Sequence, residues 1–237
     1  MSYSLGLSLL TNFEKMSKKH SSSEAIRILS ILDNRKINMD DISKEAGGRP
    51  FFHDKDTDFN ISHSGNMVIV SHVTKNGYRV GCDIEKIKPR KNIAKIAADK
   101  FSVSENKFLY TDGIFNNINF FKIWTLKESY IKLQGLSVFD MSKVPSFIKE
   151  NDQTNSLDFS FCADTNKPLT FRLYELSNIN PDTKTENTEY ILAEAFKGDY
   201  LQPELIWLSP SSLTLDCKMI AEIKAAVSPA HTVSPNR

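Results

Sequence analysis

Cysteine, unbalanced charge and long apolar runs are all scarce in this sequence. Its 237 residues include three cysteines, an odd number without metal-ligand spacing, which argues against a disulfide framework or a zinc site and favours a reducing cytoplasm. The 30 basic residues nearly balance the 29 acidic ones, so the protein has no large net charge that would attract nucleic acid or anionic lipid. The apolar run LGLSLL is too short to span a bilayer, and no run of about 18 apolar residues occurs. We therefore expect a soluble cytoplasmic protein with no nucleic-acid or membrane partner.

The chain is long enough to form one large domain or two small ones. Residues 21–33, SSSEAIRILSILD, open with serines suited to N-capping and continue with helical spacing of apolar residues, so they predict a helix that carries Arg27. Gly135 can end a later and longer helix in the left-handed conformation. The further helices are expected near residues 92–100, 103–111 and 116–134.

Strand-like runs surround these helices. Two of them flank Asn76-Gly77, the strongest short hairpin signal that a sequence offers. Five more follow from residue 144: VPSFIKE, LDFSFCA, LTFRLYEL, EYILAEAFK and ELIWLSP. Because both halves carry a long helix and a meander, we expect an α+β fold of two similar lobes with pseudo-twofold symmetry, each a long helix packed on a small antiparallel sheet.

We divide the chain into an N-terminal lobe of residues 1–88 and a C-terminal lobe of residues 89–208. Residues 209–237 are rich in Ser and Pro, and this composition predicts a flexible, loosely attached tail.

Asp83 and Glu85 lie two positions apart on the second arm of the expected hairpin. Side chains alternate between the two faces of a strand, so both acids share one face with Gly81, while Cys82 and Ile84 point the other way, toward a core. The simplest interpretation is a solvated acidic face. The alternative is a pair of ligands for a cation, which would relieve the repulsion between the two carboxylates.

Glu128 falls inside the apolar arc of the long helix, which runs from Phe120 to Ile131 in FFKIWTLKESYIK. A helix pair with Lys132 explains the spacing and is worth about 0.3–0.5 kcal/mol if exposed, but it does not explain the apolar setting. A partly desolvated carboxylate needs a cation or hydrogen-bond donors. If Glu128 met Asp83 and Glu85, the three acids would form the oxygen-rich site that Mg²⁺ prefers.

Arg49 in GRPFF and the group Ser62, His63 and Ser64 in FNISHSG supply a guanidinium, hydroxyls and an imidazole. These groups are common in phosphate-binding sites. On its own, however, a single histidine is more often structural than functional.

Taken in order, GRPFF, FNISHSG, GCDIE and FFKIWTLKESYIKLQG resemble the signature set of the Sfp-type 4′-phosphopantetheinyl transferases. The match covers residues 47–135, and a looser similarity continues to about residue 208. The resemblance implies the fold of that family and an Mg²⁺-dependent enzyme, with Mn²⁺ as the alternative ion. Such an enzyme transfers the phosphopantetheine arm of coenzyme A to a serine of an acyl or peptidyl carrier protein and releases adenosine 3′,5′-bisphosphate.

The resemblance also implies roles for individual residues. Asp83, Glu85 and Glu128 would bind the metal, and Glu128, Lys132 and Asp83 would be catalytic. Whether Glu128 or a metal-bound water takes the proton of the serine stays open. The coenzyme A contacts that it implies are Arg27, Arg49, Ser62, His63 and Lys132.

The segment KIKPRKNIAKIAADKF, residues 86–101, mixes basic and apolar side chains. One interpretation is a docking surface for an acidic carrier protein, made of Lys88, Arg90, Lys91 and Lys95 beside Ile93, Ile96 and Phe101. The other is a solvated helix whose apolar stripe faces the core.

We expect a monomer that binds coenzyme A in the cleft between its lobes. The carrier could belong to fatty acid, polyketide or nonribosomal peptide biosynthesis, and the sequence does not decide among them. The rival activity is an Mg²⁺-dependent phosphohydrolase that cleaves a nucleotide pyrophosphate with water.

Overall fold

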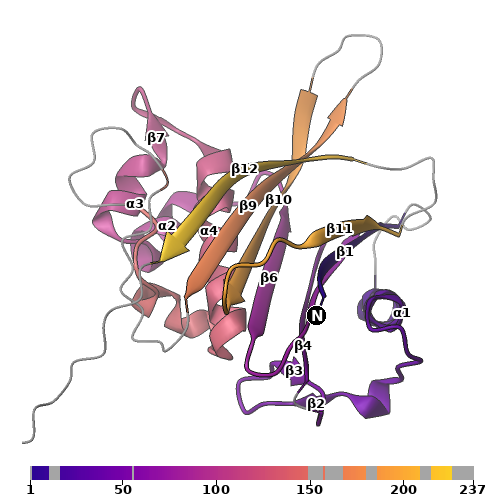
Figure 1. Cartoon of the computed structure of the whole chain (residues 1–237). Helices are drawn as coiled ribbons and strands as arrows, with labels where there is room; N and C mark the ends of the chain where they lie inside the picture. The colour runs from indigo at the N-terminus through magenta and orange to yellow at the C-terminus, as the bar shows by residue number, and fades with distance from the viewer. Residues whose placement is uncertain are drawn as a thin grey trace, which may run out of the picture.

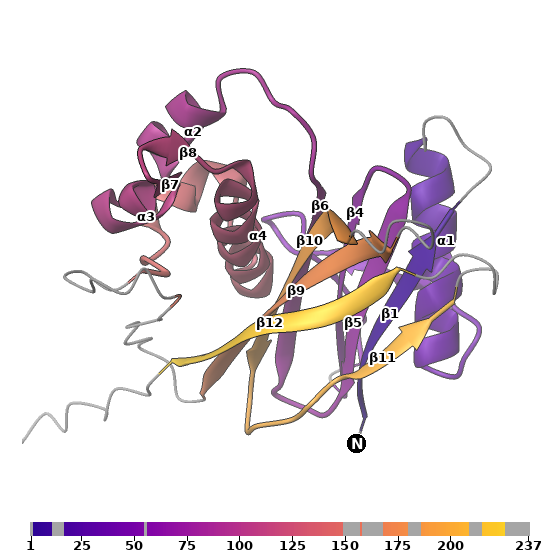
Figure 2. The same cartoon turned by 90° about the horizontal axis from the view of Figure 1, so that it is seen from above.

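The computed structural model describes residues 2–10, 17–54, 56–148, 157, 168–179, 186–208 and 215–225. Two four-stranded sheets lie between α1 on one side and α4 on the other (Figures 1 and 2). The helices are α1 (Lys18–Leu32), α2 (Ile93–Lys100), α3 (Val103–Phe108) and α4 (Asn117–Gln134), with 3₁₀ turns η1 (Met39–Asp41) and η2 (Val138–Lys143). The strands are β1 (Tyr3–Leu9), β2 (Ser43–Lys44), β3 (Pro50–Phe51), β4 (Thr57–Ser64), β5 (Met67–Thr74), β6 (Arg79–Lys86), β7 (Tyr110–Thr111), β8 (Ile114–Phe115), β9 (Leu169–Ile179), β10 (Glu186–Lys197), β11 (Glu204–Trp207) and β12 (Asp216–Ala225).

The first sheet has the strand order β11-β1-β5-β4, and α1 packs against β1 and β5. Its strands are antiparallel except that β11 runs parallel to β1. The helix predicted over residues 21–33 is confirmed, but it begins at Lys18 with Ser17 as its N-cap, so the serines at 21–23 lie inside the helix and do not cap it. A β-carbon at Gly6 would lie 2.5 Å from Ile28 Cγ2, so glycine permits the close contact between β1 and α1.

The second sheet has the order β12-β9-β10-β6, is antiparallel throughout, and packs against α4. The helix expected near residues 116–134 is confirmed, and Gly135 ends it in the left-handed conformation at φ 71°. Phe120, Phe121 and Ile131 of α4 are buried in the core between this helix and the second sheet. The α+β prediction of a helix packed on a small sheet in each half is therefore confirmed.

The hairpin predicted at Asn76-Gly77 is wrong, although the chain does turn there. The turn is closed by a hydrogen bond from Tyr78 N to Lys75 O (3.1 Å), yet β5 pairs with β1 and β4, while β6 pairs with β10 of the other sheet. The tight hairpin joins β4 to β5 instead, at Gly65 with φ 57°. A turn signal specifies that the chain reverses, but it does not specify which strands pair. Here β1 and β4 occupy both edges of β5, so β6 pairs with β10 instead.

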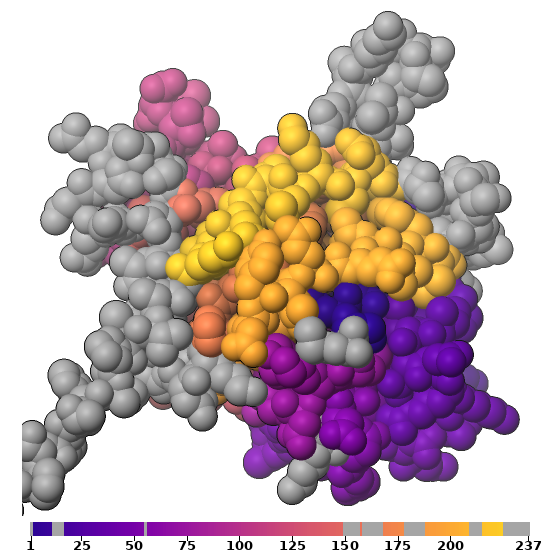
Figure 3. Space-filling model, viewed as in Figure 1, coloured from indigo at the N-terminus to yellow at the C-terminus, as the bar shows by residue number. Residues whose placement is uncertain are grey.

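The expected tail is corrected over residues 216–225, which form β12 and pair with β9. In Figure 3 the yellow atoms of this strand form a band against the orange strands beside it. Leu215 and Ile223 are buried, and their burial holds this strand against the protein although the surrounding sequence is rich in Ser and Pro. Residues 209–214 and 226–237 lie outside the described residues.

Sheet membership does not follow the predicted division at residue 88, since β6 belongs to the second sheet and β11 to the first. The helix expected over residues 103–111 ends at Phe108, and residues 144–148 form no strand. Most of the strand expected from residue 157, including Cys162, lies outside the described residues. The other two cysteines, Cys82 and Cys217, are free thiols. Among the described helices, none has the length and apolar character needed to cross a membrane.

Candidate functional site

The site forms where β4 and β6, edge strands of different sheets, face each other. Along β4, alternate side chains accept hydrogen bonds from backbone N–H groups of β6: Asp58 from Val80 (2.8 Å), Asn60 from Cys82 (3.1 Å) and Ser64 from Lys86 (3.0 Å). Ser62 shares this row but donates to the Asp83 carboxylate instead (2.9 Å). The side-chain contacts that join the two sheets therefore also reach the predicted acids.

Asp83 is 5% exposed and lies at the centre of the site. Its Oδ1 accepts hydrogen bonds from Ser62 Oγ and from Lys132 Nζ of α4 (2.6 Å). Its buried Oδ2 has no hydrogen-bond partner among the described residues. Burial raises the pKa of Asp83, although the nearby Lys132 charge opposes this shift.

Glu85 has its own hydroxyl and its own cation. Its Oε2 accepts from Ser64 Oγ (2.9 Å) and from Arg90 Nη2 (2.7 Å). Cys82 and Ile84 point away into the apolar core, as strand alternation predicts. The repulsion between the two acids is therefore reduced by two cations that belong to the chain itself.

Gly81 lets α4 approach β6 closely enough to bring Glu128 and Lys132 to these acids. A β-carbon at Gly81 would lie 2.2 Å from Ser129 O and 2.6 Å from Leu133 N, both backbone atoms of α4. The helix could not keep this position against any larger residue.

Gly81→Ala is expected to destabilise the protein by about 1–3 kcal/mol, because the helix must move or the strand must bend. Urea denaturation would measure the loss. Gly113→Ala is the comparison variant: its β-carbon would meet nothing within 4 Å, so it reports only the strain of alanine at φ 77°, about 1–2 kcal/mol. A Gly81 variant as stable as the wild type would contradict the close approach of α4.

Glu128 is half-buried on α4. Burial raises its pKa to about 7, and the charge on Asp83 adds to the shift, with a smaller part from Glu85. The three predicted acids therefore interact electrostatically across a strand and a helix. Lys132 of α4 forms an ion pair with Asp83 of β6, whereas a Glu128–Lys132 pair is not among the ion pairs of the described residues.

Within the described ranges, no three His, Cys, Asp or Glu side chains are arranged as a ready metal site. The donor set nevertheless fits a hard divalent cation, because it offers carboxylate oxygens and one of them, Asp83 Oδ2, is buried without a partner. Metal binding by Asp83, Glu85 and Glu128 stays a prediction.

The other predicted coenzyme A contacts lie in different settings. His63 is exposed on β4 and lies within electrostatic reach of Lys132 and Lys18. Desolvation by its neighbours lowers its pKa, and the Lys132 charge lowers it further. Arg27 binds Glu24 and the carbonyl of Leu208 (3.0 Å).

Arg49 is buried, with its side chain 2% exposed. Its guanidinium donates to Asp58 Oδ1 (2.9 Å), to Val80 O (2.9 Å) and to Lys132 O (3.0 Å). It thereby connects β4, β6 and the last turn of α4. To reach a phosphate, it would have to give up these bonds.

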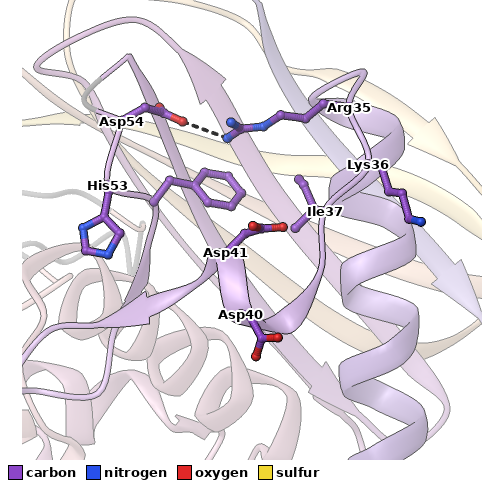
Figure 4. A pocket seen from close by; sticks show the side chains of 8 residues that line it. Arg35, Lys36, Ile37, Asp40, Asp41, His53 and Asp54 are labelled. Carbon is purple, nitrogen blue, oxygen red and sulfur yellow. Dashed lines mark hydrogen bonds and ion pairs between the residues drawn. The ribbon is translucent and has the colours of Figure 1, made fainter.

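Two hollows lie near these elements. The first, of about 180 Å³, adjoins the site and is lined by Gly47, Gly48, Arg49, Pro50, Asn60, Ile61, Lys132, Gly135 and Leu136. The second, of about 360 Å³, lies beyond the end of α1, where Arg35 and Asp54 form an ion pair (2.9 Å) at its edge (Figure 4). The second contains none of the predicted site residues.

The basic segment divides between surface and core. Lys88, Lys91 and Lys95 are exposed, whereas Phe101 is buried, and Ile93 and Ile96 pack against the main core. The apolar part of the suggested docking surface is thus used inside the protein. Only the exposed lysines of the suggested docking surface therefore stay available to a partner.

Sequence reasoning did not assign Ser64 or Arg90 to Glu85. The two-residue spacing from Ser62 to Ser64 was a usable signal, since both must share one face of β4. Sequence reasoning also assigned no role to Lys127, the residue before Glu128. Its buried ammonium pairs with Glu105 (3.1 Å) and not with Asp83 or Glu85.

The model of the 4′-phosphopantetheinyl transferase superfamily matches residues 79–193. The 4′-phosphopantetheinyl transferase AcpT of Salmonella typhi is 32% identical over 118 residues, 47% of this chain and 60% of the relative. The transferase gsp of Aneurinibacillus migulanus is 33% identical over 135 residues, 56% of this chain and 51% of the relative. The transferase Sfp of Bacillus subtilis strain 168 is 38% identical over 95 residues, 39% and 40% of the two chains.

The chain thus spans 60% or less of these relatives' lengths. The matched region contains β6 and α4, the two elements that carry Asp83, Glu85, Glu128 and Lys132. Residues 79–193 of the chain are therefore similar to the 4′-phosphopantetheinyl transferase superfamily.

Proposed function

We propose that this protein transfers the 4′-phosphopantetheine arm of coenzyme A to a serine hydroxyl of an acyl or peptidyl carrier protein. Two observations carry the proposal: the charges of Asp83 and Glu85 act on Glu128 across β6 and α4, and Lys132 forms an ion pair with Asp83. In the transfer, the serine oxygen bonds to the phosphorus, and adenosine 3′,5′-bisphosphate leaves as the pyrophosphate bond breaks.

The three acids would hold Mg²⁺, or Mn²⁺ in its place. When bound, the ion would neutralise charge on the diphosphate. Lys132 supplies a second positive charge. Burial alone would lower its pKa, but the charges of Asp83 and Glu128 outweigh burial and raise it, so the ammonium stays protonated. It can therefore stabilise the leaving phosphate or give it a proton.

Glu128 is the proposed base for the serine hydroxyl. Its pKa of about 7 is close to neutral pH, where a group can both accept and release a proton efficiently. Its place one helical turn from Lys132 puts the proposed base and the proposed acid on the same face of α4.

The hollow beside Lys132 would hold only part of coenzyme A, such as its diphosphate. His63, near the charges of Lys132 and Lys18, is the phosphate contact we propose on β4, and the contacts of Arg27 and Ser62 stay predictions. For Arg49 we propose a different role: through Lys132 O and Asp58 it holds the turn of α4 that carries Lys132.

The acceptor is proposed to be an acidic carrier protein that meets the exposed Lys88, Lys91 and Lys95. The pathway of that carrier is left open. The cytoplasmic location and the monomeric state stay predictions.

The direct test is a mass-spectrometric screen with coenzyme A, Mg²⁺ and carrier proteins from fatty acid, polyketide and nonribosomal peptide synthesis. We expect at least one carrier to gain the phosphopantetheine mass, and its serine-to-alanine variant to gain nothing. Consumption of coenzyme A that ignores the carrier would instead favour the pyrophosphate hydrolase.

A further inference from the structure

Arg90 lies in the segment between β6 and α2, which brings it back onto the strand that it has just left. Its Nη2 donates to Glu85 Oε2 at 2.7 Å, five residues earlier in the chain. The ion pair is mostly shielded, with 27% of the Arg90 side chain and 16% of the Glu85 side chain exposed. The guanidinium carbon also lies 5.1 Å from the centre of the Phe121 ring on α4. Arg90 is therefore held on two sides.

This contact occupies the oxygen that a metal ion would need. Glu85 Oε2 already accepts hydrogen bonds from both Ser64 and Arg90. An ion such as Mg²⁺ approaches a carboxylate oxygen to about 2.1 Å, so it must displace one of these donors or use the other oxygen. In the second case a fixed positive charge stays a few ångströms from the ion and repels it.

The neighbouring acid is arranged in the same way. Asp83 is paired with Lys132 and Ser62, as Glu85 is paired with Arg90 and Ser64. Lys132 comes from the long helix and belongs to the proposed chemistry, whereas Arg90 comes from a connecting segment and has no part in it so far.

We propose that Arg90 is a positioning residue that acts as an internal counter-ion of Glu85 and competes there with the divalent metal. Metal alone then binds weakly, and it binds tightly only when the diphosphate of coenzyme A adds negative charge to the site. The inference rests on the proposed function, because that function makes Glu85 a metal ligand.

The test measures Mn²⁺ binding to the protein without coenzyme A, by electron paramagnetic resonance at low ionic strength. Arg90→Gln removes the charge, and we expect it to bind Mn²⁺ about tenfold more tightly than the wild type. Arg90→Met keeps the apolar stem near Phe121 and should show the same gain, so the result does not depend on the folding of one variant. Melting temperatures check that both variants are folded.

Lys75→Gln is the matched control. It also removes one positive charge and breaks one ion pair, that with Asp199. Lys75 precedes the opposite end of β6, roughly 20 Å from Glu85 along the strand, so its Mn²⁺ affinity should equal that of the wild type.

Unchanged or weaker Mn²⁺ binding in both folded Arg90 variants would overturn the inference and leave the transferase proposal standing. A gain of the same size in Lys75→Gln would also overturn it, because the effect would then reflect net charge alone. A wild-type protein that binds no Mn²⁺ even with coenzyme A present would instead remove the metal site of the proposed function, and this inference with it.

Discussion

Asp83→Asn is expected to lower phosphopantetheinyl transfer by roughly 10²–10³-fold, the usual effect of removing one group that stabilises developing charge. Asparagine has nearly the same shape and can still accept from Ser62 and Lys132, so the local geometry should survive. What is lost is the negative charge that would bind the metal and keep Lys132 protonated. Transfer to a carrier, followed by mass spectrometry at saturating Mg²⁺ and coenzyme A, measures the change.

The stability of this variant separates a chemical effect from a structural one. Because burial raises the pKa of Asp83, a neutral side chain is tolerated there, and the melting temperature should not fall. Asp112→Asn is the control: Asp112 is exposed in the β7–β8 turn at φ 51°, which asparagine adopts readily. If Asp83→Asn transferred within tenfold of the wild type, Asp83 could not be a metal ligand in this reaction.

Glu128→Gln is expected to abolish transfer while making the metal-free protein more stable above pH 7. The folded-state pKa of Glu128 is about 7, raised by burial and then by Asp83, against about 4.3 in an unfolded chain. Between these values the folded protein holds a proton that the unfolded chain has released, so stability falls as the pH rises from about 4.3 to 7. Above pH 7 the full penalty applies, at most about 3–4 kcal/mol at about 1.4 kcal/mol per pH unit.

Glutamine cannot ionise, so it removes this penalty. Urea denaturation in EDTA at pH 5 and pH 8 should therefore show a stability gain over the wild type that is small at pH 5 and close to its maximum at pH 8. The exposed Glu204 on β11 offers a control, Glu204→Gln, which also replaces a carboxylate by an amide but does so at the surface. An equal gain at both pH values in Glu128→Gln would show that Glu128 is not a desolvated acid.

Local patterns in the sequence were sufficient to predict α1, α4 and the two faces of β6. Helical periodicity and capping depend on residues a few positions apart, which is why Gly135 could be placed as the end of α4 and why Glu128 was expected in a partly buried setting. Strand alternation likewise separated Asp83 and Glu85 from Cys82 and Ile84 before any tertiary contact was known.

The partners of these residues depend on contacts between distant segments. The sequence did not reveal that β6 leaves β5 to pair with β10, or that Arg49 is buried against α4. These outcomes follow from competition among surfaces for burial, which no local window contains. What the sequence determined by itself is which side chains share a face; which cation each acid meets, Lys132 or Arg90, was decided only by the packing of α4 and of the segment after β6.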